Sequence, residues 1–192
     1  MRTAAHLKGI PLQFSFVKIP SREHQSDVYA ALNPSRSVPT LSFTLDNGTD
    51  VIIRQSIAIL EFFEDSFPHL PPLLPPASDL LGRVRVRKLV NNISNDVQPP
   101  TNMRILNRVR DMNGDADRWA EELMYAGLSA FDQVAREKAG IYSHGDEVTW
   151  ADIVLAPAVE NAIRYGIDLD LLPTVKRIYN NLKQLEAFKL GD

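Results

Sequence analysis

Two short stretches of this sequence combine residue types that suit the binding of a peptide-like ligand. In SVPTL, residues 37–41, Pro39 leads into a run typical of a strand. A proline there can follow a cis peptide bond, which redirects the preceding backbone. The N–H and C=O groups of Val38 could then pair with the backbone of a ligand. The alternative, favoured when the motif is taken alone, is an ordinary proline at the first residue of a strand.

The second stretch is RQS, residues 54–56, directly before a predicted helix. Ser56 is a residue type that caps helices. A helix N-terminus has free amides and a partial positive charge, so it suits a carboxylate. A plain N-cap with no ligand is the alternative, and it is the simpler interpretation of this motif alone.

Composition limits the classes of protein to consider. The chain has 192 residues, is 44% hydrophobic and 23% charged, and has a formal net charge of −3 and no cysteine. This length suits one large domain or two small ones. The missing cysteine excludes a disulfide, a thiolate nucleophile and a cysteine-bound metal in this chain. The histidines lack ligand-like spacing, so no metal is expected.

Charge and hydropathy bear on partners and location. A net negative chain gives no general reason to bind nucleic acid. The first 30 residues lack an apolar core of signal-peptide type, and no run approaches the roughly 20 apolar residues of a membrane span. We therefore expect a cytoplasmic protein with no nucleic-acid or membrane partner.

The elements that must position the two motifs belong to a predicted α/β domain over residues 1–67. Short or helix-favouring residues up to Lys8 predict a helix that Gly9 ends. Strands are predicted over residues 12–19, 38–45 and 50–54, followed by a helix over 56–67. The last two strands flank DNG, a hairpin signal.

A proline-rich linker over residues 68–78 separates this domain from an all-helical part over 79–192. A helix beginning near Ser78 should be interrupted at Pro99 and Pro100. Thr149 and Asp152 predict a capping box, and a last helix is predicted from Pro173 through residue 188. One long helix should bury a single face, formed by Trp119, Leu123, Ala126, Ala130, Phe131 and Val134.

Taken together and in order, these features resemble the cytosolic glutathione transferases. Within that superfamily, LKGIPL, ALNPSRSVPTL, RQSIAILEFFED, NDVQPPTN, AGIYSHGDEVTWADIVLAP and NAIRYGIDL look like the zeta class. The resemblance implies an α/β N-terminal thioredoxin-like domain, lacking its first strand, plus an all-α C-terminal domain that shapes the substrate pocket. It also implies a homodimer.

The zeta-class resemblance implies an activity, namely the glutathione-dependent isomerisation of maleylacetoacetate to fumarylacetoacetate in tyrosine and phenylalanine breakdown. Glutathione thiolate would add reversibly to the cis double bond, allow rotation and leave the trans product. Glutathione is then a cosubstrate that is regenerated.

The resemblance also assigns roles to individual residues. Val38 before cis Pro39 pairs with the cysteinyl backbone of glutathione, and Gln55 and Ser56 hold its γ-glutamyl end. Gln98 and Asn102 match glutathione-binding positions. Arg164 matches a basic residue that attracts the carboxylates of the small dicarboxylate substrate, with a solvated helix arginine as the alternative.

In the zeta-class pattern, LKGI follows a first strand, a serine-containing SSCS-type loop and most of the first helix. This chain begins after all three, so the resemblance assigns it no catalytic residue and predicts a truncated form. The missing strand would lie between residues 12–19 and 38–45. A non-catalytic binding or interaction module is therefore the alternative to the enzyme, and a purely structural helical partner domain is a third hypothesis.

Overall fold

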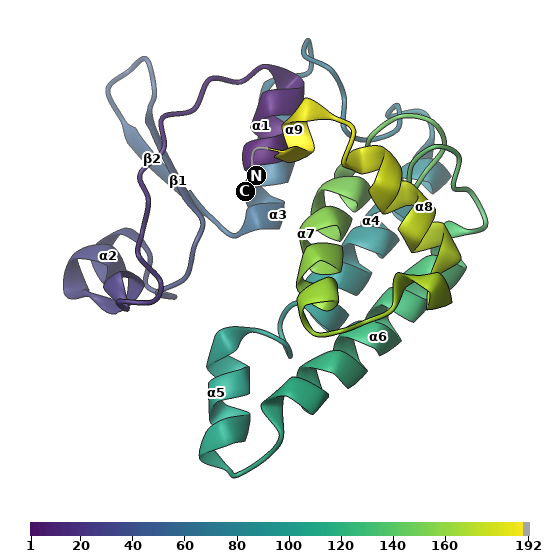
Figure 1. The fold of residues 1–192 in the computed structure, drawn as a ribbon. Helices are drawn as coiled ribbons and strands as arrows, with labels where there is room; N and C mark the ends of the chain where they lie inside the picture. Colours follow the sequence, from purple (N-terminus) through teal and green to yellow (C-terminus); the bar gives the residue numbers. More distant parts are fainter. Residues whose placement is uncertain (190–192) are drawn as a thin grey trace. The chain divides into compact units, whose positions relative to one another are not determined.

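The first of the two units into which the chain divides contains short helices, a hairpin and a longer helix (Figure 1). The computed structural model describes residues 1–189, and its units are Met1–Pro71 and Pro72–Asp192. The N-terminal unit contains α1 (Arg2–Lys8), η1 (Glu23–Gln25), α2 (Asp27–Leu32), β1 (Thr40–Thr44), β2 (Asp50–Arg54) and α3 (Ser56–Ser66).

Local sequence signals fix most of these elements. Gly9 ends α1 with φ 69°, a left-handed conformation that glycine adopts readily. The turn between the strands contains Gly48 at φ 81°, and its amide donates to the Leu45 carbonyl. β1 then pairs antiparallel with β2, from Thr40 opposite Arg54 to Thr44 opposite Asp50. The predicted helix, hairpin and following helix are confirmed.

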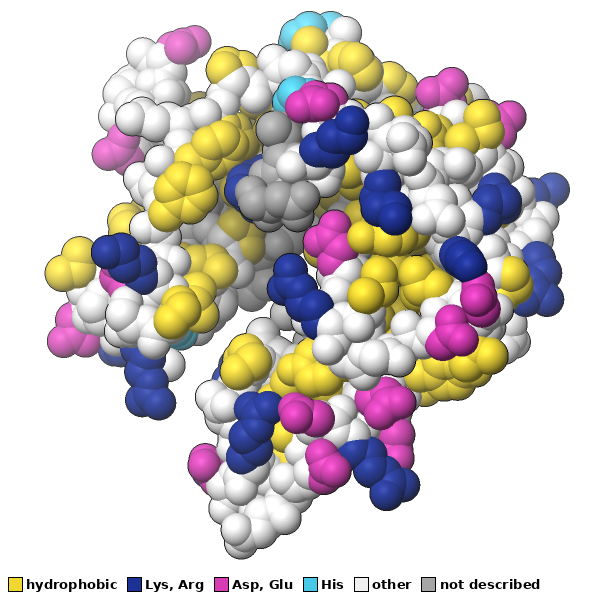
Figure 2. Space-filling view, in the orientation of Figure 1, with side chains coloured by type: hydrophobic (Ala, Val, Ile, Leu, Met, Phe, Trp, Pro, Cys, Tyr) yellow, Lys and Arg dark blue, Asp and Glu magenta, His cyan; other side chains and the backbone are white. Residues whose placement is uncertain are grey.

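The predicted strand over residues 12–19 is wrong. In the described part of the chain, β1 pairs only with β2, and residues 12–19 form no ladder with either strand. Aromatic and β-branched residues favour an extended backbone, but a strand also needs a neighbouring edge for its hydrogen bonds. The Phe14 and Phe16 side chains are 49% and 79% exposed, and hydrophobic side chains are visible on the surface of this unit (Figure 2).

The named elements of the C-terminal unit are all helices over its described residues, joined by loops. Its elements are α4 (Leu80–Asn91), the π-helical η2 (Asn92–Val97), α5 (Met103–Asp111), α6 (Ala116–Ala135), α7 (Trp150–Arg164), η3 (Leu169–Leu171), α8 (Pro173–Leu182) and α9 (Glu186–Lys189). α4 packs against α7, and α6 packs against η2 and α8. Helices therefore form most of the core of this unit, with Leu73, Leu74 and Ile167 added from the segments between them.

Two predicted helix boundaries have different outcomes. The interruption at Pro99 and Pro100 is confirmed, because η2 ends at Val97 and α5 begins at Met103. The last helix is shorter than predicted. α8 ends at Leu182, and the amides of Gln184 and Leu185 donate to carbonyls three residues back, which is a tighter turn than an α-helix has.

The predicted buried face of the long helix is wrong, because the observed face is rotated around the helix by about one residue. The side of α6 that faces the core contains Ala116, Ala120, Met124, Gly127, Leu128, Phe131 and Ala135, which are all buried. Of the predicted set, only Phe131 is buried, whereas Trp119 is 43% exposed. Gly127 explains the rotation, because a Cβ there would lie 2.3 Å from Val97 Cγ2. Because only glycine leaves room for η2 to approach this closely, the face of α6 that contains Gly127 turns toward the core.

The predicted capping box at the start of α7 is confirmed. Asp152 Oδ2 accepts hydrogen bonds from the Thr149 amide at 2.8 Å and the Thr149 hydroxyl at 3.0 Å, and Oδ1 accepts one from the Ser143 amide at 2.8 Å. Burial raises the pKa of the Asp152 carboxyl, and these hydrogen bonds oppose that shift. One carboxylate thus ties a loop to the first turn of α7.

Candidate functional site

The two motifs lie at the same end of the hairpin. Pro39 immediately precedes β1, and Gln55 immediately follows β2. Because Thr40 pairs with Arg54, the Val38–Pro39 and Gln55–Ser56 dipeptides both extend from the open end of the ladder. The antiparallel register therefore places the two predicted binding segments, Val38–Pro39 and Gln55–Ser56, side by side.

The Val38–Pro39 peptide bond is cis, as the zeta-class resemblance implies. The Val38 side chain is 48% exposed. Among residues 1–189, neither the amide nor the carbonyl of Val38 takes part in a backbone hydrogen bond of the turns and loops, and Val38 lies outside β1. The fit to a peptide-like ligand is good, since such a ligand offers one donor and one acceptor to the same residue.

Two residues that the sequence analysis did not single out hold this dipeptide in place. The Tyr29 hydroxyl donates to the Ser37 carbonyl at 2.9 Å and lies 3.1 Å from Thr40 Oγ1. Asn33, fully buried, donates through Nδ2 to the same carbonyl at 2.7 Å and to Thr40 Oγ1 at 3.2 Å. Both side chains thus bind the residues on either side of Val38–Pro39.

A sequence signal for this clamp was present in ALNPS. An asparagine before proline often starts a turn, because its side chain bonds the backbone that follows. Asn33 Oδ1 indeed accepts a hydrogen bond from the Ser35 amide at 3.1 Å. The hydrogen bond from Asn33 to Thr40 spans a loop, so it could be predicted only once the geometry of that loop was known.

Gln55, rather than Ser56, is the N-cap of α3, which corrects the predicted capping role of Ser56. Gln55 has φ 75°, an unfavourable conformation for a residue with a side chain. Such strained residues cluster at ligand sites. Gln55 makes no capping hydrogen bond through its side chain, so the amides of the first turn of α3 remain available to an anionic group.

The remaining predicted residues belong to the C-terminal unit. Gln98 is the exposed C-cap residue after η2. Asn102 is the N-cap of α5, where its Oδ1 accepts a hydrogen bond from the Arg104 amide at 3.1 Å. Asn102 therefore has a structural role of its own, and its Nδ2 group is the part left for a ligand.

Arg164 is the last residue of α7 and is exposed. Within the described part of the chain, its guanidinium forms no ion pair. An unpaired guanidinium can accept both oxygens of a carboxylate. The structure thus brings Val38, Pro39, Gln55 and Ser56 together at one end of the hairpin, and it places Gln98, Asn102 and Arg164 at helix ends in the other unit.

Over residues 1–189, no group of three or more His, Asp and Glu side chains is arranged to hold a metal ion. No helix in that range is both long and apolar enough to cross a membrane.

Known families match both units. The family model of the glutathione S-transferase N-terminal domain matches residues 1–66, and that of the C-terminal domain matches residues 105–189. Maleylacetoacetate isomerase from Emericella nidulans is 40% identical over 100% of this chain and 84% of its own length. Maleylpyruvate isomerase from a Ralstonia species is 37% identical, over 98% of this chain and 88% of its own.

Solved structures agree with these sequence relatives. Maleylacetoacetate isomerase from Anaeromyxobacter dehalogenans, with glutathione bound in its active site, has a TM-score of 0.89 and 36% identity. The alignment covers 98% of this chain and 86% of that one. A maleylpyruvate isomerase described as a bacterial zeta-class glutathione S-transferase has a TM-score of 0.88 and 36% identity, covering 98% and 88% of the two chains.

These matches confirm the predicted combination of a thioredoxin-like N-terminal domain and an all-α C-terminal domain. They extend over both units, and they include proteins whose described ligand is glutathione. The chain belongs to the glutathione S-transferase family, in its zeta class.

Proposed function

We propose that this protein catalyses the glutathione-dependent cis–trans isomerisation of maleylacetoacetate to fumarylacetoacetate, and that it has glutathione transferase activity of zeta type. The observation that supports this reaction best is the 40% identity, over the whole chain, to a maleylacetoacetate isomerase. The free Val38 backbone and the open N-terminus of α3 support glutathione as the cosubstrate.

In this proposal the N-terminal unit binds glutathione through its polar backbone. The Val38 amide and carbonyl pair with the cysteinyl residue, and the Ser56 hydroxyl, with the first amides of α3, receives the γ-glutamyl carboxylate. Gln55 and Pro39 set the backbone directions of these groups. Bound glutathione supplies the thiol that adds reversibly to the cis double bond.

The C-terminal unit supplies the remaining contacts. Gln98 and the Asn102 amide group offer donors to glutathione, and Arg164 offers an unpaired guanidinium to the carboxylates of the substrate. A fixed cation reduces the repulsion between a dianionic substrate and a thiolate, so Arg164 should act mainly on the affinity for the substrate.

A homodimer and a cytoplasmic location are part of this proposal, because the resemblance to the cytosolic zeta-class transferases implies both. The division of labour between a glutathione-binding domain over residues 1–67, a linker over 68–78 and a substrate-pocket domain over 79–192 has the same basis.

The test measures glutathione binding by calorimetry and isomerase turnover on the same preparation. Ser56→Ala should weaken glutathione binding roughly tenfold, since it removes a hydrogen bond to a charged group. Arg164→Ala should raise KM for the dicarboxylate and leave glutathione affinity unchanged. Arg118→Ala is the matched control, because Arg118 is an exposed helix arginine whose Nε already donates to Glu122.

The outcomes separate the proposal from its rivals. Glutathione binding without turnover would contradict the enzyme and support a non-catalytic module. No glutathione binding at all would support a purely structural domain. Equal effects of Arg164→Ala and Arg118→Ala on KM would remove Arg164 from the site.

A further inference from the structure

Trp119 is a large aromatic residue that the core of the C-terminal unit does not enclose. It lies on α6 next to the buried Ala120, yet it is 43% exposed. Its indole Nε1 donates a hydrogen bond to the Pro100 carbonyl, with 3.0 Å between the two atoms. An indole N–H acts only as a donor, so the direction of this bond is fixed. The role of Trp119 should therefore lie at Pro100 rather than in the core.

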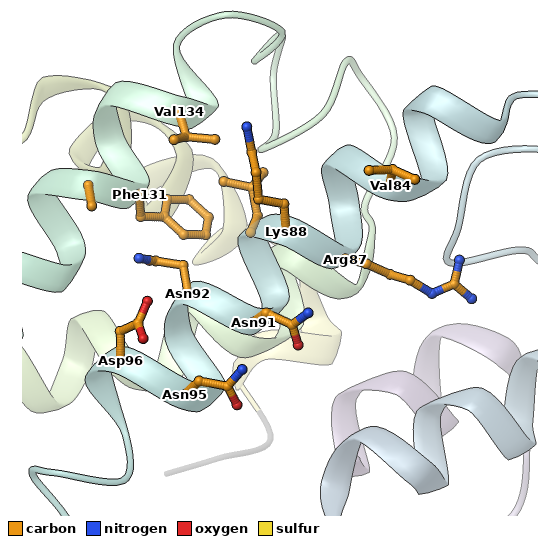
Figure 3. A pocket seen from close by; sticks show the side chains of 11 residues that line it. Val84, Arg87, Lys88, Asn91, Asn92, Asn95, Asp96, Phe131 and Val134 are labelled. Atoms are coloured by element: carbon orange, nitrogen blue, oxygen red, sulfur yellow. The ribbon is translucent and has the colours of Figure 1, made fainter.

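Pro100 is the middle residue of the loop 98–102, which joins η2 to α5. Both of these helices pack against α6. Figure 3 shows Asn92, at the start of η2, beside Phe131 of α6. Trp119 thus extends from the helix that supports both ends of the loop, and it binds the loop at its centre.

The loop can form few backbone hydrogen bonds because two of its five residues are prolines, which have no N–H. The Thr101 hydroxyl donates to the Val97 carbonyl at 2.7 Å, which ties the loop to the end of η2. Over residues 1–189, the bond from Trp119 is the only hydrogen bond that joins the loop to a helix other than the two it connects. The position of the loop on α6 therefore depends on this one donor.

The two ends of the loop are the residues of this unit proposed to bind glutathione. Gln98 and Asn102 each lie two positions from Pro100. Gln98 is exposed, and Asn102 has its Oδ1 occupied by the cap of α5. A shift of the Pro100 carbonyl would therefore move both amide side chains that are left for a ligand.

We propose that Trp119 is a positioning residue for the glutathione site. By holding the Pro100 carbonyl, it keeps the loop on α6 and keeps Gln98 and Asn102 directed toward the ligand. This inference rests on the proposed function, from which it takes the roles of these two residues. Trp119 itself touches neither glutathione nor substrate, so it acts on glutathione affinity and not on the chemical step.

The test compares Trp119→Phe with the parent, both as the full chain. The substitution keeps an aromatic ring and removes the N–H. Glutathione affinity, measured by calorimetry, should weaken roughly fivefold, as expected for the loss of one neutral hydrogen bond. The loop holds glutathione equally before and during the reaction, so KM for glutathione should rise while kcat at saturating glutathione stays unchanged.

Trp150→Phe is the matched control, because Trp150 is the other tryptophan of the chain. It is 1% exposed, and within residues 1–189 its Nε1 has no hydrogen-bond partner. The same substitution there should lower the unfolding temperature, because it leaves a gap in the core, and should leave glutathione affinity unchanged. Trp119→Phe should show the opposite pattern, with an unfolding temperature close to that of the parent.

A second background tests whether Trp119 acts through the loop. Gln98→Ala combined with Asn102→Ser removes both amide side chains, and serine retains the N-cap of α5. In this background, Trp119→Phe should cause no further loss of glutathione affinity, because the side chains that it positions are absent.

The outcomes distinguish this inference from the proposed function. A parent that binds no glutathione would overturn both. Equal glutathione affinities of the parent and Trp119→Phe would overturn the positioning role alone. A further fivefold loss in the Gln98→Ala, Asn102→Ser background would show that Trp119 acts elsewhere. A fall in unfolding temperature as large as that of Trp150→Phe would mean that Trp119 serves stability instead.

Discussion

The two units of this protein treat their hydrophobic side chains differently. The C-terminal unit fully buries large residues such as Trp150, Phe131 and Met124. The N-terminal unit, as described, buries few hydrophobic residues, namely Ala4, Ala5, Tyr29, Ile59, Leu60 and Phe63. Both units leave some large ones exposed, such as Phe16 at 79% and Leu80 at 70%. The difference shows how much more a sheet depends on its neighbours than a helix does.

The physical reason lies in the backbone. A helix satisfies its own amides and carbonyls, so a set of helices can close a core from local segments. A strand needs partner edges, and a two-stranded hairpin alone is marginal in water. In the described part of the N-terminal unit, β1 has only β2 as a partner, so this unit should open more readily than the helical one.

The largest predicted loss from removing a polar side chain is in the helical unit. Asp152→Ala removes the acceptor of the Thr149 and Ser143 amides, and leaving these buried donors unpaired should cost about 4 kcal/mol. Thermal unfolding and hydrogen exchange at the start of α7 would measure the loss. Asp170→Ala, at an exposed aspartate paired with Lys176, is the control and should stay near the parent. Equal losses in both variants would contradict a special role for Asp152.

The same residue gives the helical unit a defined pH dependence. Burial raises the pKa of Asp152 above its ordinary value of 3.8, so the folded state binds this proton more readily than the unfolded state. The contribution of Asp152 to stability is therefore fully present below that value and is lost as the pH rises through the folded-state pKa. The free energy of unfolding of the parent, minus that of Asp152→Asn, should fall over this window. A rise would show that the hydrogen bonds outweigh burial.

The next prediction concerns the buried charge of the N-terminal unit. Lys8 Nζ lies 3.1 Å from Glu64 Oε2 and donates to the Pro71 carbonyl at 2.9 Å, with the lysine side chain only 1% exposed. Lys8→Met leaves the Glu64 carboxylate without this partner and should cost about 3 kcal/mol. Faster amide hydrogen exchange in α3 would report this loss of stability. Lys18→Met, at an exposed lysine, should have little effect, and parity between the two variants would mean that the unit does not depend on this pair.

Sequence patterns predicted the helical unit better than the sheet. The capping box at Thr149 and Asp152 and the turn at Gly48 depend on residues a few positions apart, so local rules were sufficient. The prediction of a strand over residues 12–19 is wrong because strand pairing depends on residues far away in the sequence. The prediction of the buried face of α6 is wrong because two neighbouring stripes of this helix are apolar. Only the close approach of Gly127 to Val97 determines which stripe faces the core.

The candidate site follows the same division. Val38, Pro39, Gln55 and Ser56 were predicted from short motifs and family resemblance, and the register of the hairpin brings them to one end. Tyr29 and Asn33 were missed, since their role depends on a loop that folds back onto Ser37 and Thr40.

The smallest predicted effect is the most direct test of the contrast between the units. Phe16 is 79% exposed and Phe63 is 2% exposed, so Phe16→Ser should change stability by less than about 0.5 kcal/mol. Phe63→Ala should cost about 3 to 5 kcal/mol. Chemical denaturation of both variants gives the comparison. If Phe16→Ser destabilises the protein nearly as much as Phe63→Ala, residues 12–19 pack against a partner in solution, and the N-terminal unit is as closed as the helical one.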